Sequence, residues 1–261
     1  MKKLLFIILF MLPLLASAEE AVVDGIKYKL NEETMTSEAA GLADSTITDL
    51  VIPSSIKVEE KEYQVVSIGN NAFNNNFFSS ITLSEGLKTI GRASFMYSWK
   101  IEKLIIPKSV ETIEPCAFEN SSMKQLVIGE GIKTIGSCAI RNLPWLSEFY
   151  IYAPQMPEFP YDDLIDMIDE SSWYRVNLFV PNDLVEEFRQ CESSYINQIR
   201  DENILPISKD YESFLTSIRT MKSESYKSAR FSLDGRRLTS PQKGINIIRQ
   251  SDGTVRKEIV R

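Results

Sequence analysis

Two of the chain's three cysteines, Cys116 and Cys138, lie in two phrases that read almost alike, ETIEPCAF and KTIGSCAI. Such a pair can be a redox couple, part of a metal site, or two small apolar core residues. A structural zinc site needs four ligands, and only Cys191 remains in a chain without histidine. We therefore expect no metal site, while a disulfide between Cys116 and Cys138 and two free thiols in the core both stay open.

A second group of residues with chemical potential is the acidic segment 158–172. Calcium takes several oxygen ligands, and glycoside hydrolysis needs two carboxylates at a set separation. The glycine that a calcium loop uses for its sharp turn is missing, and the intervening apolar residues fit one side of a short helix. A solvated helix face is the favoured interpretation, and a calcium-dependent or carbohydrate-active accessory role is the alternative. The carboxylates are those of Asp162, Asp163, Asp166, Asp169 and Glu170.

The absence of histidine removes the usual general base at neutral pH and excludes Ser-His-Asp and Cys-His catalysis. We expect a protein that is not an enzyme and that uses no cofactor. Residues 19–207 hold 15 basic and 30 acidic residues, whereas residues 208–261 hold 12 basic and 6 acidic residues. The acidic body is expected to repel nucleic acid, because phosphate binding needs a positive surface.

The first 18 residues have the pattern of a signal peptide. Lys2 and Lys3 precede an apolar run that ends in the small-x-small triplet Ala16-Ser17-Ala18, and Leu4–Leu15 is too short to span a bilayer. We expect cleavage after Ala18, export to the cell surface or the medium, and no transmembrane span in the mature chain.

The cysteines repeat because the surrounding sequence repeats. Apolar phrases recur every 22 or 23 residues, a period that is typical of a leucine-rich solenoid, in which each turn shares its core with the next. We expect a mainly β solenoid of short strands and short helical turns. The phrases are LVIPSSI from Leu50, ITLSEGLKTIGRASF from Ile81, LIIPKSVETIEPCAF from Leu104, LVIGEGIKTIGSCAI from Leu126 and FYIYAPQM from Phe149.

Alternation within each strand predicts which side chains point outward. A contiguous apolar row on the outside often marks a binding surface, although an insertion, the tail or a neighbouring copy could equally cover it. A second outward row, Lys88, Glu111 and Lys133, alternates in charge and is expected to pair neighbouring turns. The candidate binding residues of the first row are Val51, Thr82, Ile105, Val127 and Tyr150.

The repeats need ends, because an open terminal turn exposes its core and its unpaired strand edge. Two expected hairpins, one made by VDGIKYKL and the following Met35 to Leu42 segment and one near Lys61-Glu62, belong to an N-terminal cap and its junction with the repeats. The tail predicts short strands at Arg230–Ser232, Ile245–Arg249 and Val255–Val260. The expected organisation is a cap at 19–60, about five repeats within 47–157, a closing segment with a short helix at 158–207, a linker at 208–227 and a small β-module at 228–261.

The phrases SSITLSEGLKTIGRASF, LIIPKSVETIEPCAF and VIGEGIKTIGSCAI resemble the repeats of BspA-like leucine-rich repeat proteins. VIPSSIKVEEKEYQVVSIGNNAF resembles the entry repeat of that family, and NLFVPNDLVEEFRQCESSYINQIRDENILPI resembles its closing segment. The tail FSLDGRRLTSPQKGINIIRQSDGTVRKEIVR is similar to small C-terminal β-modules of exported bacterial proteins, some of which act in secretion or surface sorting. Repeat four departs from the pattern, with Ile140 in place of phenylalanine and Gly129 in place of proline.

The resemblance implies a secreted or surface-exposed binding and adhesion protein. We therefore expect the strand face to bind an unknown protein or glycan of a host or a neighbouring cell. Assembly of the chain with its own copies is a further alternative, and the oligomeric state is open.

Overall fold

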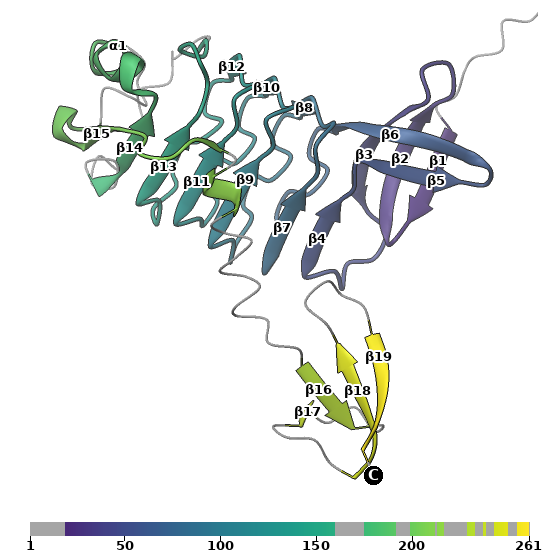
Figure 1. Ribbon diagram of the computed structural model, residues 1–261. Coiled ribbons are helices and arrows are strands. Elements are labelled where there is room, and N and C mark those ends of the chain that lie inside the picture. The colour runs from purple at the N-terminus through teal and green to yellow at the C-terminus, as the bar shows by residue number, and fades with distance from the viewer. Residues whose placement is uncertain are drawn as a thin grey trace, which may run out of the picture. The chain divides into compact units, whose positions relative to one another are not determined.

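The computed structural model (Figure 1) describes residues 19–159, 175–191, 199–211, 213–216, 229–232, 237–238, 243–249 and 255–260. The chain forms two compact units, residues 1–207 and 208–261. The expected signal peptide, nearly all of the acidic segment and residues 217–227 of the expected linker lie outside the described residues.

The chain begins with three hairpins in one sheet, two of them consecutive. The first turns at Asp24-Gly25, where both residues have positive φ, as a tight hairpin turn requires. Its second strand forms the next hairpin with Thr36–Leu42, as expected from VDGIKYKL and the Met35 to Leu42 segment. The third turns at Glu59-Glu60, two residues before the position that the sequence indicated. Thr36–Leu42 also pairs parallel with the third hairpin and so connects the cap to the repeats. These strands are β1 (Glu19–Val23), β2 (Ile26–Asn31), β3 (Thr36–Leu42), β5 (Ser55–Val58) and β6 (Lys61–Ile68).

Each repeat contributes one strand of four residues and, in the middle turns, a second strand of two residues, so that the stacked turns form parallel ladders on two sides (Figure 1). The short strands extend the sheet of the cap beyond β6; they are β8 (Thr89–Ile90), β10 (Thr112–Ile113) and β12 (Thr134–Ile135). The longer strands are β4 (Asp49–Ile52), β7 (Ser80–Leu83), β9 (Lys103–Ile106), β11 (Gln125–Ile128) and β13 (Glu148–Ile151).

The closing segment adds two further strands to the main ladder, β14 (Asn177–Val180) and β15 (Ile204–Pro206). The expected short helix between them is α1 (Val185–Arg189), which follows the 3₁₀ turn η3 (Asn182–Leu184); a second 3₁₀ turn, η4 (Asp201–Asn203), precedes β15. Val185 and Phe188 of α1 are buried, so the helix packs its apolar side against the end of the solenoid.

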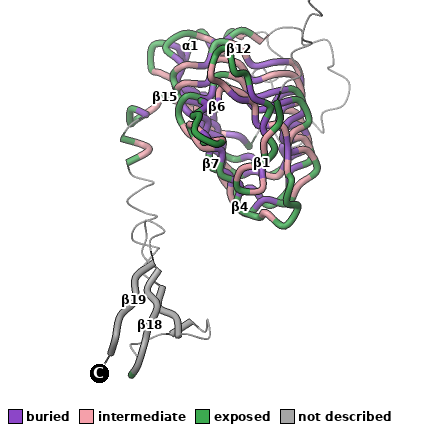
Figure 2. The backbone as a smooth tube through the Cα atoms, turned by 90° about the vertical axis from the view of Figure 1, so that its right-hand side faces the viewer, coloured by how far each residue is buried: buried purple, intermediate pink, exposed green. Residues whose placement is uncertain are grey.

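The core is a set of identical positions stacked turn upon turn. Ile90, Ile113 and Ile135 are fully buried in register, as the repeat predicted. At the corner of the turns, the Phe95 ring lies between those of Phe73 and Phe118, with centroids 5.5 and 5.6 Å away. Figure 2 views the stack from the side of the cap and shows buried stretches alternating with intermediate and exposed ones along the turns.

The two cysteines occupy the same corner of adjacent turns, and the structure holds them as free thiols. Both have left-handed backbone, with φ of 59° at Cys116 and 57° at Cys138, as does Asn71 at the same place in an earlier turn. Burial raises the pKa of the Cys116 thiol to about 12, with a further contribution from the carboxylate of Glu119. The thiolate that disulfide exchange requires is therefore scarce at neutral pH.

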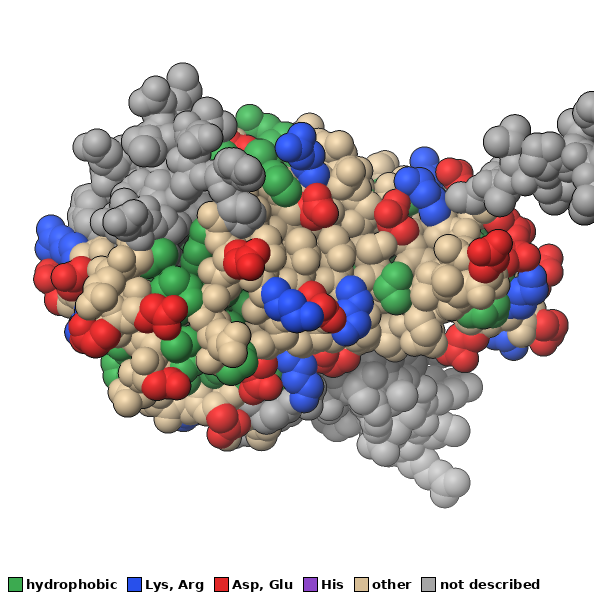
Figure 3. Space-filling model, turned by 90° about the horizontal axis from the view of Figure 1, so that it is seen from above, with side chains coloured by type: hydrophobic (Ala, Val, Ile, Leu, Met, Phe, Trp, Pro, Cys, Tyr) green, Lys and Arg blue, Asp and Glu red, His purple; other side chains and the backbone are tan. Residues whose placement is uncertain are grey.

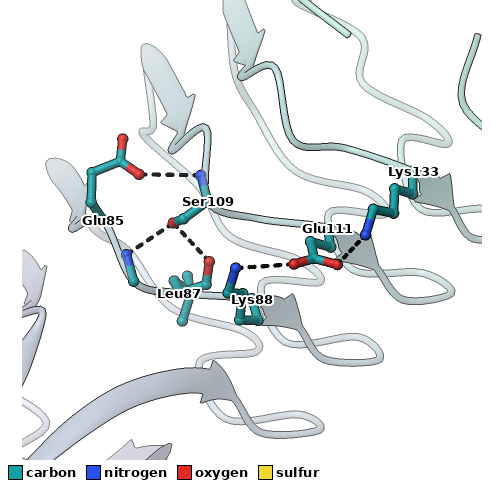
Figure 4. A network of polar contacts seen from close by, with 7 residues as sticks. Glu85, Leu87, Lys88, Ser109, Glu111 and Lys133 are labelled. Atoms are coloured by element: carbon teal, nitrogen blue, oxygen red, sulfur yellow. Dashed lines mark hydrogen bonds and ion pairs between the residues drawn. The ribbon is translucent and has the colours of Figure 1, made fainter. Parts of the chain in front are cut away.

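The alternating charges join three neighbouring turns, as expected. The Glu111 carboxylate accepts hydrogen bonds from the Lys88 and Lys133 ammonium groups at 3.0 and 2.5 Å (Figure 4). Beside this row, the Ser109 hydroxyl donates to the Leu87 carbonyl at 2.8 Å and accepts from the Gly86 N–H at 2.9 Å. Figure 3 shows basic and acidic side chains side by side near the middle of this face.

These two lysines lower the pKa of Glu111 to about 2, mainly through the hydrogen bonds from Lys133 and Lys88. A lowered carboxyl pKa adds stability above the unfolded pKa, which is about 4.3 for glutamate, and that contribution is lost as the pH falls toward the folded value. We expect the Glu111 carboxyl to titrate near pH 2 by NMR in low salt. In Glu111→Gln, the stability deficit relative to the unaltered chain should shrink between about pH 4 and pH 2. A normal titration midpoint for Glu111 would contradict the pairing.

The second unit is a four-stranded antiparallel sheet in the order β17-β16-β18-β19. Its strands are β16 (Ala229–Ser232), β17 (Arg237–Leu238), β18 (Gly244–Arg249) and β19 (Val255–Val260), and three of them coincide with the strands expected in the tail. The segment expected to be a linker, 208–227, contains a helical turn at residues 213–216. Asp210 caps this turn by accepting hydrogen bonds from the Ser213 N–H and hydroxyl at 2.9 and 2.8 Å.

Candidate binding surface

The five candidate binding residues occupy equivalent places in successive turns, but they are divided between two sheets. Val51 and Thr82 pair in the two-stranded sheet of β4 and β7, and both are exposed. Ile105, Val127 and Tyr150 pair in register in the five-stranded sheet of β9, β11, β13, β14 and β15.

The expectation that Val127 is exposed is wrong. Its exposed fraction is 0%, whereas Ile105 and Tyr150 on the flanking strands are half-buried. Alternation identified the correct face of the sheet, but it does not report what neighbouring side chains cover.

The apolar row continues beyond the repeats, which the sequence did not reveal. Phe179 of β14 is in register with Tyr150, and Leu205 of β15 is in register with Phe179. The Tyr150 and Phe179 rings stack with centroids 4.4 Å apart and planes inclined by 9°, and the Tyr152 ring lies 6.4 Å from that of Tyr150. The alternating phrase NLFV was the available signal, but the insertion before it broke the 22–23-residue period. We call Ile105, Val127, Tyr150, Phe179 and Leu205 the strand face.

A polar row borders the strand face on its N-terminal side. The Gln125 amide donates a hydrogen bond to the Glu148 carboxylate, which also accepts from the Tyr150 hydroxyl at 3.5 Å. Burial raises the pKa of Tyr150, and the charge of Glu148 raises it further, so the phenol stays protonated at neutral pH. The surface thus combines an apolar centre with fixed hydrogen-bonding groups at its rim, which is the composition of protein-binding sites. The four members of the row are Lys103, Gln125, Glu148 and Asn177.

Other kinds of site find little support in the described part of the chain. Within the described ranges, no three His, Cys, Asp or Glu side chains are grouped so that they could hold a metal ion. The same residues contain no helix that is long and apolar enough to cross a membrane. The five carboxylates of the acidic segment lie outside the described residues, so the calcium-dependent and carbohydrate-active alternatives stay predictions.

Several solved structures are similar to this chain. A leucine-rich repeat protein from Bacteroides capillosus is 18% identical with a TM-score of 0.39, and the alignment covers 62% of this chain and 99% of that one. The pneumococcal vaccine antigen PcpA is 18% identical with a TM-score of 0.40, and 63% of this chain and 47% of that one are covered. A leucine-rich repeat protein from Bacteroides ovatus is 17% identical with a TM-score of 0.35, with coverages of 61% and 55%. The chain thus spans about half the length of the last two. A search of curated proteins found no match.

The sequence pattern described as "BspA type Leucine rich repeat region" matches residues 43–156 in six copies. The expected repeat range was 47–157 with about five turns, so the match begins slightly earlier and counts one repeat more. Its six copies cover the main strands β4 to β13, which supply the first three members of the strand face. Residues 43–156 are a BspA-type leucine-rich repeat region, and the described part of the chain is mainly β.

Proposed function

We propose that this chain is an exported, non-enzymatic binding protein whose strand face captures a macromolecule of a host or a neighbouring cell. The observation that carries the proposal is the row of apolar side chains with two stacked aromatic rings on one side of the sheet, all half-buried except the fully buried Val127. Aromatic anchors contribute much of the affinity of protein interfaces, and a rigid sheet loses little entropy when it binds.

Three further points support the proposal. The family is in general one of binding proteins without catalytic activity, and the chain has no histidine to act as a general base. The N-terminal 18 residues have the pattern of a signal peptide. The face is rimmed by fixed polar groups, which favours recognition of a defined partner over non-specific adsorption.

A double variant tests the proposal. The chain without residues 1–18, labelled with a fluorophore, is applied to cultured epithelial cells and to bacterial cells, and bound label is measured by flow cytometry. Ile105→Ser combined with Tyr150→Ser should reduce the bound label at least fivefold, because both side chains supply half-buried apolar surface at the centre of the strand face. Val127 is left unaltered, since its burial would make a serine there a test of folding.

Val22→Ser serves as the matched control, because Val22 is an exposed valine of the cap far along the sequence from the strand face. The control should bind like the unaltered chain, and both variants should keep its far-UV circular dichroism spectrum. Equal binding by the double variant, or no binding by the unaltered chain, would contradict the proposal.

A further inference from the structure

A second exposed surface lies just before the main strands and consists of aromatic side chains. Phe77 is 57% exposed and Trp145 64% exposed, and Tyr97 and Trp99 are also exposed. Each of these rings presents a large apolar area to water, and a group of such rings on one surface often marks a binding site. We call Phe77, Tyr97, Trp99 and Trp145 the aromatic corner.

The backbone segments that carry Phe77, Tyr97 and Trp99 lie side by side on adjacent turns. The Trp99 N–H donates to the Asn76 carbonyl at 2.9 Å, and the Asn75 N–H donates to the Met96 carbonyl at 2.8 Å. Residues 75–77 therefore run beside residues 96–99 on the adjacent turn. The Lys100 ammonium group lies 5.8 Å from the centroid of the Phe77 ring, which places a hydrogen-bond donor at the same spot.

The aromatic corner extends over four turns. The register that pairs Lys103, Gln125 and Glu148 places Lys100, Ser122 and Trp145 on one row three residues earlier. The Lys100 N–H donates to the Ser122 hydroxyl at 2.8 Å, which confirms that row for its first step. With about 4.8 Å between neighbouring turns, the row from Phe77 to Trp145 is about 14 Å long. The row has an aromatic ring at each end, Phe77 and Trp145, and two polar side chains, Lys100 and Ser122, between them.

From this arrangement we infer that the aromatic corner binds a neutral polysaccharide, with sugar rings lying against the exposed aromatic rings. A pyranose ring presents C–H bonds on one face and hydroxyl groups around its rim, so it matches a flat ring flanked by hydrogen-bonding side chains. Lys100 and Ser122 provide such groups between the rings.

The charge of the body argues for a neutral polymer over an anionic one. Residues 19–207 carry 15 basic and 30 acidic residues, so a sulfated or uronic acid polymer would be repelled. One lysine at the corner does not reverse that field. The inference uses residues separate from the strand face and does not depend on the proposed function.

Affinity electrophoresis tests the inference. The chain without residues 1–18 is run in native gels that contain laminarin, galactomannan or dextran, and heparin serves as the anionic probe. At least one neutral polysaccharide should retard migration, and Trp99→Ala combined with Trp145→Ala should weaken the apparent association at least tenfold. Lys100→Ala should weaken it to a smaller extent, since it removes a hydrogen-bond donor and leaves the rings in place.

The controls separate this inference from the proposed function. Val22→Ser and the strand-face pair Ile105→Ser and Tyr150→Ser should migrate like the unaltered chain in every polysaccharide gel. No retardation by any neutral polysaccharide, equal retardation of the double tryptophan variant, or retardation by heparin alone would overturn the inference. A strand-face variant that loses cell binding but keeps its retardation supports both proposals independently.

Discussion

Phe95→Ala should lower the free energy of unfolding by about 4 kcal/mol, as is typical of truncating a fully buried phenylalanine. The Phe95 ring lies between two other phenylalanine rings, so its removal leaves a cavity bounded by the next turn on each side. Successive turns of a solenoid share their core, and a gap in a middle turn weakens the contacts on both sides of it. Urea denaturation of the chain without residues 1–18, followed by circular dichroism, measures the effect.

The matched control for this variant is Phe77→Ala. It truncates the same residue type in the preceding turn, but the Phe77 side chain is largely exposed. Its effect should stay within about 0.5 kcal/mol, as for other surface substitutions. Similar losses of unfolding free energy in both variants would show that the stacked phenylalanine rings are not a main source of the core's stability.

Gly131→Ala should destabilise the protein by about 3 kcal/mol or more, although it adds a single methyl group. A Cβ atom at this position would lie 2.0 Å from the Lys108 carbonyl oxygen and 3.2 Å from that of Val110. Both obstacles are backbone atoms of the adjacent turn, so they cannot move aside as a flexible side chain would. The repeats would have to separate locally, which opens the ladder between β9 and β11.

Glu130→Ala is the control for Gly131→Ala, since Glu130 is the preceding residue and is exposed. Its unfolding midpoint in urea should match that of the unaltered chain. A loss of less than about 1 kcal/mol for Gly131→Ala would show that adjacent turns can separate at little cost, which is inconsistent with close packing. The same geometry accounts for Gly129, which stands where a proline was expected: a Cβ there would lie 2.6 Å from the Lys108 backbone.

The sequence was sufficient to predict the repeats because their period is a local property. The equivalence of Ile90, Ile113 and Ile135, and the pairing of Lys88, Glu111 and Lys133, follow once the phrases are aligned. Each turn is bounded by backbone hydrogen bonds to the next, so residues one period apart must become neighbours. The same reasoning placed both cysteines at one corner.

The sequence was insufficient where a property depends on spatial contacts that the repeat spacing does not fix. Val127 follows the outward alternation, yet its side chain is fully buried. Phe179 and Leu205 join the strand face through β14 and β15, after an insertion that hides their equivalence to Tyr150. The exposed rings of Phe77 and Trp145 are 68 positions apart along the chain and join one row only when the turns stack.

The sequence by itself determined that this protein is a solenoid, which residues face its core and where its turns repeat, because apolar periodicity and strand alternation are read along one dimension. The tertiary structure alone decided which outward residues remain exposed, how far the strand face extends and which aromatic rings meet. Those properties depend on the volumes of side chains that lie side by side in space, and such neighbours are not encoded at any fixed spacing in the sequence.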